Sequence, residues 1–126
     1  MSVQRLSAKD FTMLENPGVH SQQLIWPRNA PEATVTMTRV TMDPGATTAR
    51  HSHSKSEQNW VVERGTATLL LGHDKTLEVR AGDVIHTPAG EVHGLTNTGT
   101  EPFVYLTATT PPINLTKDYQ ALIDPV

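Results

Sequence analysis

Short runs of β-branched and apolar residues alternate with clusters of turn-forming residues along most of this chain. Glycine, proline, asparagine and aspartate separate the runs, for example at Asp43-Pro44-Gly45 and at Pro88-Ala89-Gly90. Because short strands at intervals of about 8–12 residues are typical of β-sandwiches and barrels, we predict an all-β fold. The expected strands are 22–26, 33–42, 57–63, 66–71, 76–79, 84–87, 92–96 and 103–109.

Helical periodicity is nearly absent, and the one stretch that could form a short helix is 115–122. There, Leu115, Tyr119 and Leu122 recur on one side of a helix. A chain of 126 residues is long enough to enclose one hydrophobic core. We divide it into an N-terminal extension (1–26), a barrel (27–112) and a C-terminal tail (113–126).

Composition excludes several classes of partner and chemistry. The formal net charge is −3 and there is no basic run, so we expect neither nucleic acid nor an anionic membrane as a partner. The chain contains no cysteine, which excludes disulfides, thiolate metal sites and a cysteine nucleophile. The N-terminus lacks the apolar core of a signal peptide, and the longest apolar run, Leu69-Leu70-Leu71, is too short to span a bilayer. We therefore expect a cytoplasmic protein.

Two glycine-bounded segments carry three histidines in a pattern that suits a metal site. The first segment, 45–65, contains His51 and His53, and the second, 82–97, contains His93. Side chains two residues apart in a strand point to the same face, so His51 and His53 can offer nitrogens to one cation. His93 would converge from a distant strand. We predict one divalent metal with open positions for water or substrate. Imidazole ligands suit iron, manganese, nickel, copper or zinc and do not choose among them.

These segments resemble the two signature motifs of the cupin superfamily, as found in its single-domain members of the conserved-barrel type. The first segment matches at Gly45, His51, His53 and Gly65, and the second at Gly82, Pro88, Gly90, His93 and Asn97. The resemblance implies a double-stranded β-helix, or jelly-roll barrel, that holds one metal. It also implies a homodimer, to which the extension 1–26 could contribute by crossing to a partner subunit.

The fourth ligand position departs from the family pattern. The usual family ligand is a glutamate seven positions before the closing glycine, and counting back from Gly65 reaches Gln58. Gln58 would share the interior face of its strand with Trp60, whereas Glu57 would need a bulge to turn inward. We therefore predict Gln58 as the fourth ligand and keep Glu57 as the alternative. A neutral amide leaves a divalent ion its full charge, which would favour an anionic or enolisable oxygen ligand.

Four further side chains are candidates for the pocket around the metal. Trp60 would form a pocket wall or part of the core, and Tyr105 would offer its hydroxyl to the pocket or fill the core. Arg39 would be a natural partner for a carboxylate if it points inward. His86 could transfer a proton near the metal or occupy an ordinary strand position.

The resemblance implies that the site serves a small, oxygen-rich or anionic molecule. Cupins of this size resemble dioxygenases most often, so a metal-dependent dioxygenase is the first expectation. The alternatives are a cupin isomerase or lyase, similar to the sugar-acid ketoisomerases, and a non-catalytic cupin that binds a small molecule. Fold alone is weak evidence for any one chemistry.

Overall fold

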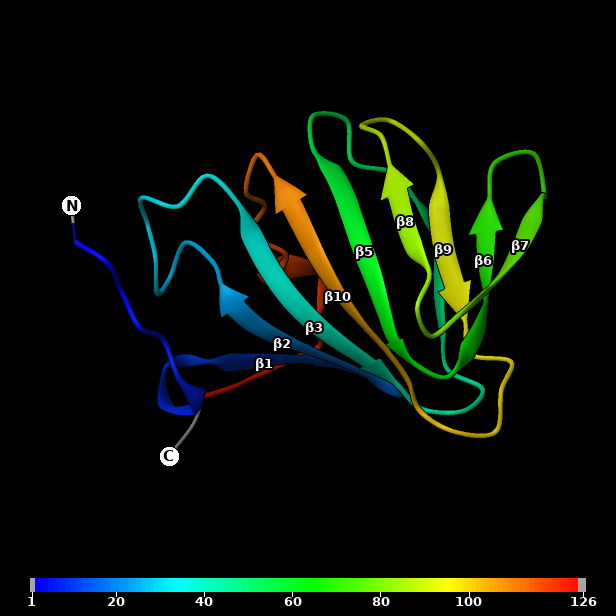
Figure 1. The fold of residues 1–126 in the computed structure, drawn as a ribbon, viewed down its shortest axis with the longest axis horizontal. Helices are drawn as coiled ribbons and strands as arrows, with labels where there is room; N and C mark the ends of the chain where they lie inside the picture. Colours follow the sequence, from blue (N-terminus) through cyan, green and yellow to red (C-terminus); the bar gives the residue numbers. More distant parts are fainter. Residues whose placement is uncertain (1, 125–126) are drawn as a thin grey trace.

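Two antiparallel β-sheets form the fold in a computed structural model that describes residues 2–124 (Figure 1). The strands are β1 (Thr12–Asn16), β2 (Val19–Ile25), β3 (Thr36–Met42), β4 (Thr47–His51), β5 (Glu57–Arg64), β6 (Thr66–Leu71), β7 (Thr76–Arg80), β8 (Val84–Thr87), β9 (His93–Thr96), β10 (Phe103–Thr110) and β11 (Ala121–Ile123). The larger sheet has the order β11-β1-β2-β3-β10-β5-β8, and the smaller sheet has the order β4-β9-β6-β7. The predicted all-β jelly-roll architecture is confirmed.

Every strand predicted from the sequence forms, although some ends shift. The predicted helix over 115–122 is wrong, because this stretch contains only the 3-10 turn η2 (Thr116–Asp118) and then enters β11. Tyr119 packs against the core, and β11 pairs with the edge of β1. These tertiary contacts override the weak helical spacing. The only other helical turn in the described residues is η1 (Ala8–Asp10).

Both ends of the chain join the larger sheet. The N-terminal extension contributes β1 and β2, which continue the sheet outward from β3. The tail returns to pair as β11 with β1. A contact between the extension and a second subunit stays a prediction, as does the division of the chain at residues 27 and 112. Residues 1, 125 and 126 of the predicted segments lie outside the described part.

The inner face of the larger sheet is apolar at one end and polar at the other. Along β3 the buried side chains are Thr36, Thr38, Val40 and Met42, and along β10 they are Phe103, Tyr105, Thr107 and Thr109. The two strands pair in register, so like positions lie side by side. The apolar end joins the smaller sheet in one core cluster that includes Leu69 and Leu95. The polar end adjoins the candidate site described below.

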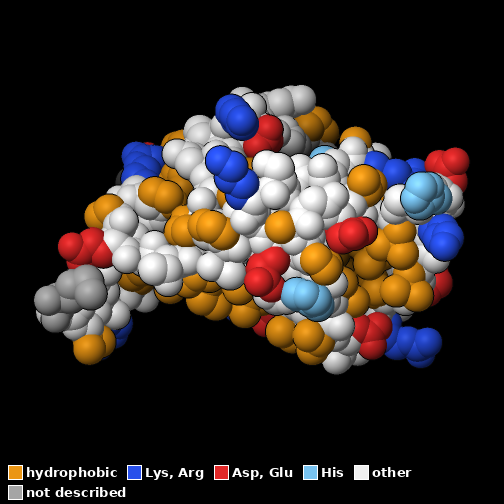
Figure 2. Space-filling model, turned by 90° about the horizontal axis from the view of Figure 1, so that it is seen from above, with side chains coloured by type: hydrophobic (Ala, Val, Ile, Leu, Met, Phe, Trp, Pro, Cys, Tyr) orange, Lys and Arg blue, Asp and Glu red, His pale blue; other side chains and the backbone are white. Residues whose placement is uncertain are grey.

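The outer surface carries scattered charges. On the face seen in Figure 2, basic and acidic side chains are scattered among polar and apolar ones, and neither sign forms a large patch. Some apolar side chains are also exposed, among them the cross-strand pair of Val61 on β5 and Val84 on β8. No helix in residues 2–124 is long and apolar enough to cross a membrane.

Candidate metal centre

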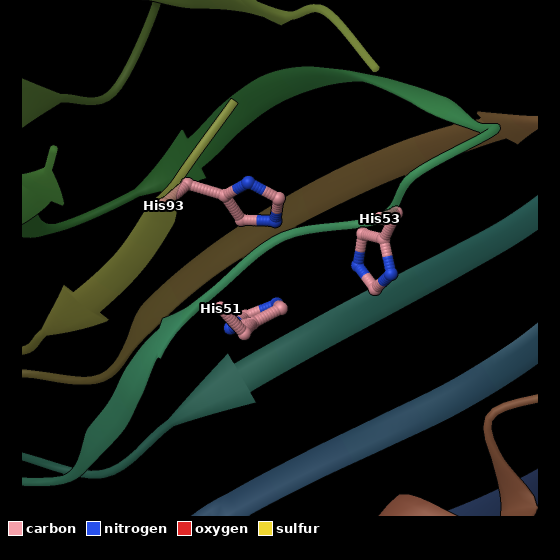
Figure 3. A group of neighbouring side chains, drawn as sticks. All are labelled: His51, His53 and His93. Atoms are coloured by element: carbon pink, nitrogen blue, oxygen red, sulfur yellow. The ribbon is translucent and has the colours of Figure 1, made fainter. Parts of the chain in front are cut away.

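Three histidine rings converge between the two sheets (Figure 3). One ligand nitrogen from each of His51, His53 and His93 lies within 4.8 Å of the other two. The ring centroids of His51 and His93 are 4.4 Å apart, and His53 lies 5.1 Å from the first and 5.3 Å from the second. Nitrogens at these separations can share one cation at bond lengths of about 2.0–2.1 Å after small side-chain movements.

A bulge in β4 turns His51 toward the site. Thr48 pairs with Leu95 and His51 pairs with His93, so β4 has one more residue than β9 between these two pairs. The extra residue reverses the alternation of side chains along β4. His51 therefore faces its partner across the site, while Arg50 points outward and donates from Nε to the carbonyl of Leu71 at 2.8 Å.

Close packing of β4 on β9 brings the two ligand strands together. Gly94 lies beside His93, and a Cβ at this position would meet the carbonyl oxygen of Thr48 at 2.8 Å. Only glycine allows the two backbones to approach this closely. On the other side, the backbone N–H of Gly90 donates to the carbonyl of His53 at 2.8 Å, which ties the loop before β9 to the third ligand.

Backbone carbonyls select the tautomers of two of the histidines. The Nδ1 atom of His51 lies 2.8 Å from the carbonyl of Ala49, and Nδ1 of His93 lies 3.1 Å from the carbonyl of Glu91. A carbonyl only accepts, so each Nδ1 carries the proton and donates it. Each Nε2 then keeps its lone pair, which is the form that binds a metal.

Electrostatics also favour neutral rings at the site. Burial, followed by the influence of His51, lowers the pKa of His93 to about 4. Burial and His51 also lower the pKa of His53, against an opposing effect of Asp118. Both rings are therefore neutral at pH 7 and need not lose a proton to bind a cation.

The residues present fit a bound metal ion. The Nε2 atom of His93 is buried and has no hydrogen-bond partner. Buried polar atoms without a partner are rare because desolvation costs about 1–3 kcal/mol, and a cation shared with His51 and His53 would satisfy this one. The donors are three imidazoles, which suit the transition metals of the first row.

Gln58 lies on the interior face of β5, where its amide is held by two side chains. Its Oε1 accepts a hydrogen bond from Nε1 of Trp60 at 3.2 Å, and its Nε2 donates to Oγ1 of Thr109 at 3.2 Å. Because the indole N–H can only donate, Trp60 fixes which end of the amide is the oxygen. The second lone pair of this oxygen stays available, and ligation of a metal by Gln58 stays a prediction.

Glu57 faces away from the interior. Its carboxylate is on the outer side of β5, where it accepts from Nδ2 of Asn59 at 3.1 Å, and its side chain is 42% exposed. The pairing of β5 with β8 is regular from Gln58 to Val61, so no bulge turns Glu57 inward. The strand alternation predicted from the sequence therefore holds at this position.

Two of the four pocket candidates lie inside the barrel. Trp60 is buried beside the site, with its ring 5.8 Å from that of His93. It belongs to the core cluster as well, so it serves as core and as a wall toward the histidines. Tyr105 stacks on Trp60 at 4.8 Å between centroids and fills the core. Burial raises the pKa of its hydroxyl, with a further rise from Tyr119.

The other two candidates point outward, so the alternative that places each of them outside the pocket is the one observed. Arg39 donates from Nε to the carboxylate of Glu63 at 2.9 Å on the outer face of the larger sheet. The inner positions of β3 on either side of it are Thr38 and Val40. His86 is exposed on β8 and its Nδ1 contacts the side chain of Asn59, on the face opposite Gln58.

A cavity of about 520 Å³ opens beside His53. It lies between the β4–β5 loop (residues 52–56) and residues 111–114, which follow β10. Sequence reasoning did not include this second segment in the site. Its only signal is the pair Pro111-Pro112, which marks the end of a strand but says nothing of where the chain goes next.

Comparisons with known proteins agree with this arrangement. The sequence pattern of the family described as "Cupin domain" matches residues 38–109. Over 77 residues the chain is 32% identical to the oxalate decarboxylase OxdC of Bacillus subtilis (strain 168), a match that covers 58% of this chain and 20% of that protein. The chain thus spans about a fifth of the length of this curated relative.

Solved structures share the fold. KdgF from Halomonas sp. superposes with a TM-score of 0.74 at 17% identity, covering 90% of this chain and 97% of the other. The formate complex of an oxalate decarboxylase from Lactobacillus farciminis superposes with a TM-score of 0.72 at 27% identity, covering 91% of this chain and 33% of the other.

Proposed function

Because the chain belongs to the cupin domain family, we propose that it holds one divalent transition metal and uses it on a small, oxygen-rich or anionic molecule. The ligands would be His51, His53 and His93. The observation that carries this proposal is the buried Nε2 of His93, which has no hydrogen-bond partner and lies among the ligand atoms of the other two histidines.

Gln58 is the fourth ligand in this proposal. Its interior position beside Trp60 supports the assignment. The indole N–H of Trp60 donates to the amide oxygen and so fixes which end of the amide is the oxygen, the atom that would bind the metal. Four neutral ligands would leave the ion its full charge of +2. Such a centre would attract the anionic or enolisable oxygens of a substrate more strongly than a centre with a glutamate ligand.

A dioxygenase is the first form of this function. A redox-active metal in the site would supply the reaction with molecular oxygen. The inner face of the larger sheet supports this choice, because its buried side chains are apolar residues, threonine, serine and glutamine, with no carboxylate in the described residues to act as a base. Trp60 and Tyr105 would shield the reacting group from water on the apolar side.

A lyase or isomerase is the second form. It is supported by the 32% identity to an oxalate decarboxylase over 77 residues and by the similarity in fold to another oxalate decarboxylase. In this form the metal would polarise a carbonyl or carboxylate group. A base would have to come from the rim of the site, where Lys55 lines the cavity and Asp118 is near enough to His53 to raise its pKa.

Metal content tests the shared part of the proposal. Elemental analysis of protein purified without added metal should find about one first-row metal ion per chain, and His51→Ala should lose most of it. His51 is exposed, so this variant should keep its fold, which circular dichroism checks. No metal in the unmodified protein, or equal content in the variant, would contradict the proposal.

Oxygen consumption then separates the forms. Iron-loaded protein should consume oxygen with at least one member of a panel of catechols, β-diketones and α-hydroxyketones. Turnover that continues under argon would assign the lyase or isomerase form instead. Binding without turnover in either atmosphere would leave a non-catalytic binding protein.

A further inference from the structure

The C-terminal segment 111–120, here called the strap, runs along the open side of the barrel next to the candidate metal centre. Its start is tied to the β4–β5 loop, since Oγ of the buried Ser56 donates to the carbonyl of Pro111 at 2.7 Å. Its end is tied to the β1–β2 hairpin, since Nδ2 of Asn16 donates to the carbonyl of Asp118 at 3.0 Å. Tyr119, which follows Asp118 and precedes β11, packs against the core cluster.

The strap is one wall of the cavity beside His53. Its residues 111–114 face residues 52–56 across a volume of about 520 Å³. This volume falls in the range of about 300–1,000 Å³ that holds small-molecule ligands. The strap lies beyond residue 109, where the match to the cupin family pattern ends.

The lining of the cavity has a defined chemical character. Ser52 and Ser54 supply hydroxyls, Asn114 supplies an amide, and Ile113 supplies apolar surface. Lys55 is the single charged residue among the described residues that line the cavity, and no carboxylate lines it. A cation held by neutral ligands at the adjoining histidines would make this space positive. Asp118, farther along the strap, lies near enough to His53 to raise its pKa and offsets part of this charge.

We propose that the strap is the ligand-selecting wall of the metal site, and that the cavity takes a small, hydroxylated molecule with one negative charge. This inference rests on the proposed function, because the metal is the main attraction for the anionic end of the ligand. Lys55 adds to that attraction at the rim, the serines and Asn114 bind hydroxyls, and Ile113 packs against the carbon chain.

Three probes of equal chain length separate these features. Gluconate has one carboxylate and several hydroxyls, glucitol has the hydroxyls without the charge, and hexanoate has the charge without the hydroxyls. Isothermal titration of zinc-loaded protein should show gluconate binding at least ten times more tightly than either of the others, because each of the others lacks either the charged group or the hydrogen-bonding hydroxyls. Equal affinity for gluconate and glucitol, or for gluconate and hexanoate, would overturn the inference.

Matched variants test the wall itself. Ile113→Ala should weaken gluconate binding about three- to tenfold through lost packing, whereas Leu115→Ala, on the same strap but outside the cavity lining, should not. Lys55→Gln should weaken it about two- to fivefold, whereas the exposed Lys117→Gln should not.

Zinc stoichiometry, measured for each variant, separates a failure of the role of the strap from a failure of the proposed function. One zinc per chain with equal effects from Ile113→Ala and Leu115→Ala would overturn the role of the strap and leave the proposed function intact. No zinc in the unmodified protein would overturn the proposed function and this inference with it.

Discussion

Replacing Gly94 with alanine tests whether the approach of β4 to β9 sets the geometry of the histidines. The new Cβ would lie 2.8 Å from the carbonyl oxygen of Thr48 and 3.0 Å from backbone atoms of Ala49. Ordinary contacts are about 3.5 Å or longer, so β4 must move by roughly 0.7 Å. Such overpacking costs about 1–3 kcal/mol, which for a domain of this size lowers Tm by about 4–11 °C.

The same movement displaces His51 relative to His93, because the two residues are paired across these strands. Metal sites tolerate errors of about 0.2 Å in ligand distance, so zinc affinity should fall at least tenfold. The matched control is Gly72→Ala, since a Cβ there meets nothing closer than Val92 at 3.9 Å. Thermal unfolding and zinc titration of both variants supply the measurement. If Gly94→Ala resembles Gly72→Ala in both, the strand-approach argument is refuted.

Three further predictions concern single side chains. Gln58→Glu should raise the affinity for divalent metal and reduce the preference for anionic ligands, because the carboxylate lowers the charge of the loaded site by one. Titration measures both quantities, and unchanged values would count against Gln58 as a ligand. Thr107→Val should raise the free energy of unfolding by up to about 1 kcal/mol, because the buried Thr107 hydroxyl has no hydrogen-bond partner. Denaturant unfolding checks this, and a clear fall in the free energy of unfolding would show that the hydroxyl does make a hydrogen bond. Burial lowers the pKa of His20, but the hydrogen bonds that its ring donates to Asp43 and Glu15 outweigh burial, so the net pKa is raised. The stabilisation is therefore complete below pH 6.5 and is lost as pH rises through the higher folded value. His20→Gln should flatten the pH dependence of the free energy of unfolding between pH 6 and 8, and an unchanged pH profile would contradict this assignment.

Strand periodicity carried most of what the sequence could predict. Alternation with a period of two placed Gln58 and Trp60 on the inner face of β5 and Glu57 on the outer face, as observed. Turn residues marked the ends of strands, and Gly45 and Gly90 adopt the positive φ angles expected of such turns. These features depend on neighbouring residues alone, which is why a sequence can show them.

Features that depend on distant contacts were not predictable in the same way. Nothing in the sequence marks the extra residue that turns His51 inward, because the bulge exists only against β9. Arg39 was ambiguous since Val35 and Met37 share its face, and apolar residues usually mark the inside. Here the inner positions of β3 near the site are Thr36 and Thr38, so the polar lining of this end inverts the usual pattern.

The C-terminal region was misjudged for a related reason. Leu115, Tyr119 and Leu122 have helical spacing, but Tyr119 packs on the core and Leu122 pairs with Leu14 across β11 and β1. Each contact joins residues that lie far apart in the chain. The strap and its cavity therefore emerge only from the folded structure.

X-ray absorption spectroscopy of the zinc-loaded protein tests the central claim most directly, because it counts the imidazole ligands of the metal. We expect three imidazole nitrogens at about 2.0–2.1 Å in the unmodified protein and two in His51→Ala loaded with zinc. A spectrum with oxygen ligands alone, or one that His51→Ala leaves unchanged, would contradict this claim.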